Sequence, residues 1–370
     1  SQRLKSIPAE VEKKFSNEFI TKTRLMILKI TSVSVSSQTF SKKISKMRLT
    51  EAFTLPQMLS RRAFTLALAL LSLPSFAKPQ RMRIVVPYPA GGHLDAAARM
   101  VAEGLKTHHG RVIVDNRAGA AGARGMLEVK NAAADDQTLV IGALATLVVN
   151  PLLFDDLPYK PDDFSPVALL SDAPNVLVMT QKSMDRLGIK NASDLMQYIA
   201  KHPGELNCAS GGTGSAGHIL NALLDTKGLH SVHVPYAGAM AAQLSLYAGE
   251  TDFMFDNFGN ARGPIADGRL NVLAQTAAQP LAEINAPTLS SIGIEADIST
   301  WFGLMAPKDT AMSVREALFE EISQILSEAK KQKQFEAACG KVKLLSPQAF
   351  SQWIETEQVK YRSFVQSLKI

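Results

Sequence analysis

The stretch of the chain best suited to bind an anion is RIVVPYPAGGHLD, residues 83–95, in which a short apolar strand runs through a proline-glycine loop into a predicted helix. The first turn of a helix carries backbone N–H groups without intrahelical partners, and the helix dipole adds partial positive charge there. Gly91 and Gly92 have no Cβ, so a carboxylate or a phosphate can approach this backbone closely. An ordinary turn between a strand and a helix has the same pattern, so this loop alone does not establish a site.

A second glycine loop, SGGTGSAGH at 210–218, also lies between a predicted strand and a predicted helix. Its glycines fit the dinucleotide fingerprint G-x-G-x-x-G. The strand that follows, however, ends in His-Val-Pro-Tyr at 233–236 and not in the acidic residue that holds a ribose. Dinucleotide binding is therefore the weakest interpretation of this loop.

Ser215, in the same loop, allows two other interpretations. It lacks the first glycine of a nucleophile elbow, and His218 follows only three residues later, which leaves a serine hydrolase as a minority hypothesis. Alternatively, the loop is a second helix N-terminus that offers N–H groups and the Ser215 hydroxyl to an anion. Two such loops that face one cleft would hold a carboxylated ligand between them.

Asp256 and Asn257 end the strand predicted at 252–257. Ligands of open α/β sheets bind at the carboxyl ends of the strands, so these side chains are expected to face the same cleft. Both residue types are also favoured as helix N-caps, and the two roles are compatible. We expect Asp256 to accept a hydrogen bond from an ammonium or hydroxyl group of the ligand.

Composition and charge argue against several classes of protein. The 370-residue chain has a net charge of +6, but residues 1–77 hold 13 Lys and Arg against 4 Asp and Glu. The remainder is mildly acidic, which removes the support for nucleic-acid binding. The seven histidines are scattered and Cys208 lies far from Cys339, so no metal site and no cofactor are predicted. Whether the two cysteines pair stays open.

The segment MLSRRAFTLALALLSLPSFA, 58–77, has the layout of a secretory signal peptide, with a basic start, an apolar run, Pro74 and a small-residue end. Its apolar run is shorter than the roughly 20 residues of a transmembrane helix. The residues SRRAF, 60–64, resemble a twin-arginine signal, but ordinary secretory signals also carry arginines, so the export route stays open. Residues 1–57 are either an extension that does not belong to the working protein or a basic disordered tail.

From residue 83 onward, predicted strands alternate with predicted helices, as is typical of α/β folds with a parallel sheet. The pattern occurs twice, which predicts two α/β lobes with a cleft between them. The first unit has strands at 84–86, 112–114 and 139–143 and helices at 96–105 and 125–132. The second has strands at 175–179, 206–210, 233–236, 252–257 and 271–276 and helices at 192–201, 218–227, 239–248 and 259–267. A predicted strand at 301–307 leads the chain back from the second unit to the first. Predicted helices at 314–329 and 347–368 are expected to pack on the first lobe.

With these loops identified, residues 83–367 resemble a Bug-type, or TctC-like, solute-binding protein, the extracytoplasmic receptor family of tripartite tricarboxylate transporters. The resemblance rests on several motifs in the right order, which are more specific together than any single glycine loop. These motifs are IVVPYPAGGHLD (84–95), VDNRAGAAG (114–122), VNPLLF (149–154), DLPYKPDDFSPVALL (156–170), APNVLVM (173–179), LNCASGGTGSAGH (206–218), VHVPYAG (232–238), DFMFDN (252–257), APTLSSIGI (286–294) and WFGLMAP (301–307).

The resemblance implies a type II periplasmic-binding-protein fold, whose two α/β lobes close around a small carboxylate without catalysis. We expect lobe 1 to comprise 78–178 and 303–370, and lobe 2 to comprise 179–302. The ligand-binding residues that the resemblance implies, together with His93 and Thr146 as additional candidates, are Tyr88, Ala90, Gly91, Gly92, His93, Asp95, Thr146, Ser210, Gly211, Gly214, Ser215, His218, Tyr236, Gly238, Asp256 and Asn257.

The chain departs from the family pattern beside the expected pocket. Similar proteins usually read PAGGGTD or PAGGSTD, whereas this chain has His93 and Leu94, so a hydroxyl donor is lost and an imidazole is gained. His93 either contacts the ligand or points to solvent. Ala118 and Gly217 are further departures, which leave the fold unaffected and the substrate open.

The leading hypothesis is a monomeric periplasmic protein that captures a small mono- or dicarboxylate or an amino acid by lobe closure. Its partners would be the membrane permease subunits of a tripartite tricarboxylate-type transporter, and no nucleic acid. Two alternatives stay open: an exported serine hydrolase that uses Ser215, and a receptor that presents its ligand to a membrane sensor kinase.

Overall fold

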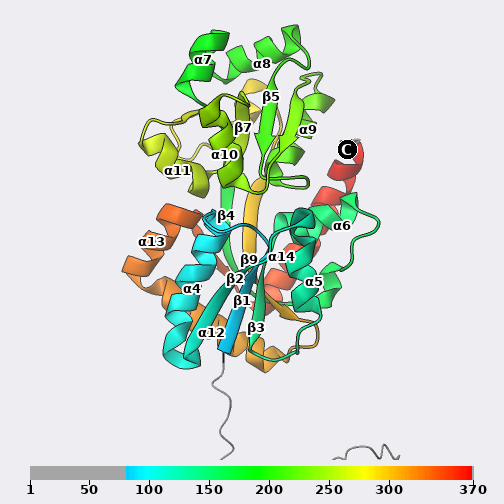
Figure 1. The fold of residues 1–370 in the computed structure, drawn as a ribbon, viewed down its shortest axis with the longest axis vertical. Coiled ribbons are helices and arrows are strands. Elements are labelled where there is room, and N and C mark those ends of the chain that lie inside the picture. Colours follow the sequence, from blue (N-terminus) through cyan, green and yellow to red (C-terminus); the bar gives the residue numbers. More distant parts are fainter. Residues whose placement is uncertain (1–80, 369–370) are drawn as a thin grey trace, which may run out of the picture. The chain divides into compact units, whose positions relative to one another are not determined.

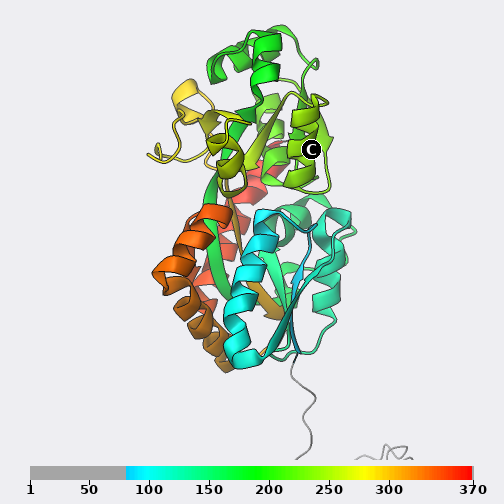
Figure 2. The ribbon, with the colours of Figure 1, turned by 60° about the vertical axis from the view of Figure 1, so that its left-hand side comes forward.

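The computed structural model describes residues 81–368 of the chain. The predicted signal peptide and the segment before it lie outside the described residues. The described chain forms two mixed sheets that share the long strand β4 (Phe164–Met179) (Figures 1 and 2). No described helix is both long enough and apolar enough to cross a membrane.

The first sheet has the strand order β2-β1-β3-β9-β4. Its strands are β1 (Arg81–Val86), β2 (Arg111–Asn116), β3 (Thr138–Ala143) and β9 (Ser299–Pro307), with β10 (Val342–Leu345) paired to β4. Strand β1 is parallel to β2 and β3, while β9 is antiparallel to β3 and to β4.

The second sheet repeats this arrangement in the order β4-β7-β5-β6. Its strands are β5 (Asn207–Ser210), β6 (Val232–Pro235), β7 (Phe253–Asn257) and β8 (Asn271–Gln275), which pairs with β4. Strand β4 pairs with β9 as far as Pro174 and with β7 from Asn175 onward, so one strand passes from the first sheet into the second.

The expectation of a parallel sheet is correct for β1, β2 and β3 and for β5, β6 and β7, but wrong for β4, β8 and β9, which pair antiparallel. The strands β4 and β9 connect the two sheets without a crossover helix, and only a parallel neighbour requires such a crossover. The isolated strand expected at 175–179 is therefore the second half of a 16-residue strand.

Helices cover both faces of each sheet (Figure 1). One face of the first sheet packs on α4 (His93–His109), α12 (Met312–Ser327) and α13 (Ala329–Cys339), and the other on α5 (Ala123–Lys130) and α14 (Pro347–Ser367). The second sheet packs on α7 (Gln181–Leu187), α8 (Ala192–Lys201) and α9 (Ala216–Thr226) on one side, and on α10 (Ala239–Ala248) and α11 (Phe258–Ala266) on the other. A short helix, α6 (Asn150–Leu153), follows β3.

The C-terminal helices pack on the first sheet, as expected. The expected single helix at 314–329 is followed by a separate helix, α13, because Glu328 has extended backbone angles of φ −64° and ψ 116°. The apolar spacing of α4 explains why this segment is a helix. Its residues Ala97, Val101 and Leu105 are spaced by four, so they lie on one face, which is fully buried against β1 and its neighbours. This packing fixes the N-terminus of α4 beside the cavity described below.

Candidate ligand-binding site

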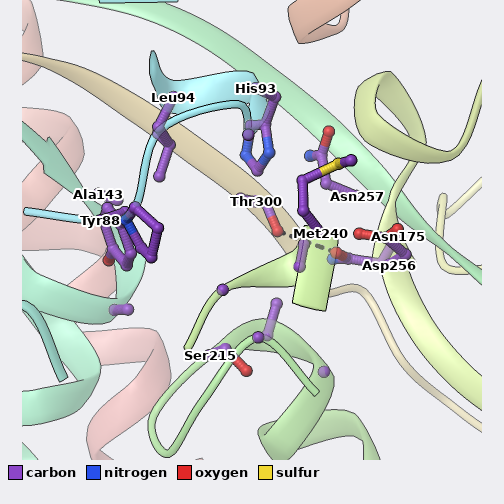
Figure 3. Close-up of a pocket in the computed structure, with 18 of the residues that line it drawn as sticks. Tyr88, His93, Leu94, Ala143, Asn175, Ser215, Met240, Asp256, Asn257 and Thr300 are labelled. Carbon is purple, nitrogen blue, oxygen red and sulfur yellow. Dashed lines mark hydrogen bonds between the residues drawn. The ribbon is translucent and has the colours of Figure 1, made fainter. Parts of the chain in front are cut away.

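A cavity lies where the loops of the two sheets meet (Figure 3). Its walls come from the loop between β1 and α4, the end of β3, the loops that precede α9 and α10, the end of β7, the second half of β4 and the start of β9. The lining residues are Tyr88, Pro89, Ala90, Gly92, His93, Leu94, Asp95, Ala143, Leu144, Ala145, Asn175, Gly211, Ser215, Ala216, Gly217, Ala237, Gly238, Ala239, Met240, Met254, Phe255, Asp256, Asn257 and Thr300.

The loop after β1 is held in place by Asp95. Its Oδ2 accepts hydrogen bonds from the Gly91 N–H at 3.0 Å and from Arg99 Nε at 2.9 Å, and its Oδ1 accepts from Asn116 Nδ2 at 3.0 Å. Burial acts to raise the pKa of Asp95, but the hydrogen bonds from Arg99, Gly91 and Asn116 outweigh it and lower that pKa. Gly92 is the N-cap of α4 and makes no side-chain cap, so the first-turn N–H groups stay available to a ligand.

The loop after β5 presents a second helix N-terminus to the same cavity. Ser215 is the N-cap of α9, and its Oγ accepts a hydrogen bond from the His218 N–H at 3.3 Å. His218 Nδ1 in turn accepts from the Gly214 N–H at 3.1 Å. The imidazole therefore supports the loop and is not placed as a base for the Ser215 hydroxyl.

A polar layer lies behind this loop and outside the cavity lining. Ser210 Oγ is 2.6 Å from His233 Nε2 and accepts from the Gly212 N–H at 3.2 Å. His233 stacks on His218, with ring centroids 4.1 Å apart. Burial lowers the pKa of both imidazoles, that of His233 to about 4 with a further contribution from His218. Both side chains are therefore uncharged at neutral pH.

The carboxyl end of β7 supplies two polar residues to the cavity wall. Asp256 is 3% exposed and accepts hydrogen bonds from Gln243 Nε2 at 2.6 Å and from Asn260 Nδ2 at 3.0 Å. Burial raises the pKa of Asp256 to about 6, even though these hydrogen bonds act to lower it. Asn257 caps α11, where its Oδ1 accepts from the Gly259 N–H at 2.9 Å.

Ten of the predicted residues line the cavity and six do not. Those that line it are Tyr88, Ala90, Gly92, His93, Asp95, Gly211, Ser215, Gly238, Asp256 and Asn257. Ser210, Gly214 and His218 lie in the supporting layer just described, because their polar groups bond within the loop. Gly91 and Tyr236 line neighbouring cavities.

Thr146 is the sixth predicted residue outside this cavity. It is fully buried in a short π-helix (Ala145–Val149), and its Oγ1 accepts a hydrogen bond from the Ala143 N–H at 3.0 Å. Its hydroxyl thus closes the turn after β3.

Several lining residues were not predicted, above all Asn175, Thr300 and Met240. The Thr300 hydroxyl donates to Asn175 Oδ1 at 2.9 Å, the contact drawn as a dashed line in Figure 3, and Asn175 Nδ2 donates to the Ile298 carbonyl at 3.0 Å. An asparagine inside the otherwise apolar APNVLVM was a usable signal. Thr300 and Met240 carried none, because only the fold brings them to the cavity.

Uncharged groups dominate this cavity. No lysine or arginine is among the described residues that line it. Burial lowers the pKa of His93 to about 4, so that imidazole is uncharged at neutral pH. An anion here would depend on backbone N–H groups and helix dipoles for stabilisation. Among residues 81–368, no group of three His, Cys, Asp or Glu side chains is placed to hold a metal ion.

The comparisons with known proteins agree with this arrangement. Residues 97–370 match the family model described as the tripartite tricarboxylate transporter family receptor. A curated relative from Pseudomonas sp. strain P51, the UPF0065 protein of the tcbD–tcbE intergenic region, is 31% identical over 326 residues, which cover 83% of this chain and 94% of the relative.

Solved structures resemble the chain over most of its length. Rpa4515 of R. palustris, solved with adipate, is 27% identical with a TM-score of 0.73, and the match covers 79% of this chain and 98% of that one. MatC of Rhodopseudomonas palustris, solved with malate, is 28% identical with a TM-score of 0.69 and covers 78% and 100%. The periplasmic binding protein BugD is 25% identical with a TM-score of 0.72 and covers 79% and 99%.

Proposed function

The chain belongs to the tripartite tricarboxylate transporter receptor family and has the fold of periplasmic binding proteins, and from this premise we propose that it captures a small carboxylate between two lobes. Members of this family bind solutes and are not enzymes, so the serine hydrolase alternative is wrong. The bond from the His218 N–H to Ser215 Oγ fits the same conclusion, since it makes the hydroxyl a helix cap.

The observation that carries the carboxylate proposal is the meeting of two helix N-termini at one cavity. Gly92, at the start of α4, and Ser215, at the start of α9, both line it. Asn257, 4% exposed and lining the same cavity, has an Nδ2 without a partner in the described part of the chain. Adipate and malate, bound by two relatives, are ligands of the proposed class.

We place lobe 1 at 78–178 and 303–370 and lobe 2 at 179–302. These boundaries fall a few residues after Pro174, where β4 changes partners, and after Ser299, where β9 begins. A ligand in contact with both lobes would shift the protein toward a closed state by its extra contacts there.

Asp256 is proposed to accept a hydrogen bond from a hydroxyl or ammonium group of the ligand. A carboxylate offers about four acceptor positions, and Gln243 and Asn260 do not occupy all of them. Asp256→Ala is expected to weaken binding of a hydroxy or amino acid more than tenfold. Unchanged affinity for every tight ligand would contradict this role.

The proposed partners are permease subunits of a tripartite tricarboxylate-type transporter, with a sensor kinase as the alternative. The protein would reach the periplasm through the signal peptide predicted at 58–77 and act there as a monomer. Deletion of the gene for this protein should abolish uptake of the identified ligand. Normal uptake together with loss of a transcriptional response to that ligand would favour the sensor kinase.

Thermal-shift screening of the purified protein against organic acids and amino acids tests the carboxylate proposal. A ligand at 100 times its Kd stabilises the folded state by about 2.7 kcal/mol, which raises the Tm by roughly 4–5 °C in a chain of this size. If no compound in a broad carboxylate set raises the Tm, the proposed function is wrong.

A further inference from the structure

Two polar atoms at the cavity have no hydrogen-bond partner within the described part of the chain: Asn257 Nδ2 and His93 Nε2. The Gly259 N–H donates to Asn257 Oδ1, which fixes the amide so that Nδ2 is the unpartnered donor. Leaving a buried donor unpaired is costly, and most such groups in proteins are satisfied. These atoms therefore point to a ligand group that forms hydrogen bonds.

His93 is held in place by packing. Its ring meets Phe302 edge to face, with centroids 5.6 Å apart and an angle of 61° between the planes. Figure 3 shows the imidazole extending from the start of α4 into the cavity. A neutral imidazole carries one N–H and one bare nitrogen, so it can donate to a ligand or accept from it.

A second negative charge on the ligand would find no positive partner here. No lysine or arginine is among the described lining residues, and Asp256, next to Asn257 in the chain, adds negative charge when ionised. Apolar side chains such as Leu94, Met240 and Phe255 form much of the remaining wall. Burial of an unpaired carboxylate in such surroundings is far more costly than burial of an amide or a hydroxyl.

We propose that the ligand is a monocarboxylate whose other end is an uncharged hydrogen-bonding group, a carboxamide or a hydroxyl, bound by His93 and Asn257. This proposal rests on the carboxylate-binding function proposed above and narrows its substrate class. His93 belongs to the first lobe and Asn257 to the second, so a group that bonds to both joins the lobes and favours the closed state.

Matched acids of equal length test the proposal. Adipate, adipic acid monoamide, 6-hydroxyhexanoate and hexanoate differ only at one end, and succinate, succinic acid monoamide and butyrate form a shorter set. At pH 7.5, calorimetric titration should show the monoamide or the hydroxy acid of one set binding at least tenfold more tightly than both the diacid and the unsubstituted acid of equal length.

Variants assign the preference to the two residues. Asn257→Ser keeps an oxygen that can cap α11 but removes the Nδ2 amide donor without adding a charge, and His93→Ser removes the imidazole. Each should reduce the preference for the neutral end at least fivefold, with a cooperative melting transition retained. His202→Ser, a change at a partly exposed histidine that caps the C-terminus of α8 far from the cavity lining, should keep the wild-type preference.

The outcomes separate the two proposals. The proposal of a neutral end group is wrong if the diacid binds as tightly as the monoamide and the hydroxy acid, or if both variants keep the wild-type preference. Carboxylate binding would still stand in either case. If no acid of either set and none of the wider screen binds, the proposed function itself fails.

Discussion

The rings of His218 and His233 stack with an angle of only 18° between their planes, directly behind the loop that caps α9. One ring accepts from the Gly214 N–H and the other lies within hydrogen-bond distance of Ser210 Oγ. The first contact ties the glycine loop to the start of α9, and the second joins the end of β5 to β6. The shape of the ligand-facing loop thus depends on two uncharged histidines.

This pair predicts a loss of stability in mild acid. In the folded protein, burial lowers the pKa of both imidazoles, that of His233 to about 4. A histidine of the unfolded chain has a pKa of about 6.5, so below that pH the unfolded chain binds more protons than the folded protein. Stability present above pH 6.5 should therefore fall as the pH drops toward 4. Urea unfolding at pH 7.5 and at pH 5 measures this loss. His233, which is partly exposed, should account for on the order of 1 kcal/mol of the difference in the free energy of unfolding.

The variant His233→Gln isolates this contribution. It should be less stable than the wild type at pH 7.5, because the stacking is lost, yet lose less stability on acidification. Asp256, whose pKa is raised to about 6, acts in the opposite direction in both proteins and cancels in the comparison. His230→Gln, at an exposed site, should keep the wild-type acid sensitivity; equal acid sensitivity in His233→Gln would contradict the assignment.

Two glycines of the cavity wall should respond differently to alanine. A Cβ at Gly217 would lie 2.8 Å from the Phe255 carbonyl oxygen, so Gly217→Ala should cost about 1–3 kcal/mol of stability. A Cβ at Gly92 would meet no atom within 4 Å, and Gly92→Ala should cost less than about 1 kcal/mol as an N-cap change. Chemical unfolding of the two variants compares these costs.

Gly92→Ala should nevertheless weaken carboxylate binding at least tenfold, since its Cβ would occupy space that the ligand needs above the first turn of α4. Wild-type affinity in this variant would show that the carboxylate does not approach the backbone there.

Two substitutions of Ser215 distinguish its role as a helix cap from its role in ligand binding. Ser215→Ala removes the cap and should cost about 1 kcal/mol. Ser215→Asp keeps an acceptor for the His218 N–H, so stability should be retained, but its charge would repel an anion at the same N-terminus. Titration with the tightest ligand of the screen should detect no binding to Ser215→Asp; binding at wild-type affinity would place the carboxylate elsewhere.

The local pattern predicted most elements well. The helices expected at 192–201 and 239–248 have those bounds in the structure, because their apolar spacing and flanking turns are local signals. The length of β4 could not be predicted, since Pro166, Ser171 and Pro174 interrupt its apolar pattern, and only pairing with β9 and β10 makes the segment a strand.

The candidate site shows the same limit. Its two loops could be found because proline and glycine mark them in the sequence. Which side of a loop faces the cavity is a property of the fold, so Ser210 and His218 were predicted as ligand contacts although their side chains support the loop from behind. Asn175 and Thr300 reach the cavity from strands that join the two sheets, a position that no local pattern reveals.

A buried pair joins the C-terminal helix to one of these connecting strands. Trp301 Nε1, on β9, donates to Glu357 Oε2, on α14, at 2.7 Å, and the two residues are 0% and 6% exposed. Glu357→Gln keeps an acceptor and should change stability by less than about 1 kcal/mol, whereas Glu357→Leu leaves the indole N–H unpaired and should cost about 1–3 kcal/mol. Urea unfolding followed by tryptophan fluorescence measures both.

The pH dependence of this pair has a defined sign. Burial raises the pKa of Glu357, although the bond from Trp301 acts to lower it, so the folded wild type takes up a proton more readily than the unfolded chain. The wild type should therefore gain stability relative to Glu357→Gln as the pH falls through that raised pKa, and lose it again at higher pH. A constant difference between the two proteins across this range would mean that the carboxyl does not titrate there, and that the indole bond alone accounts for the pairing.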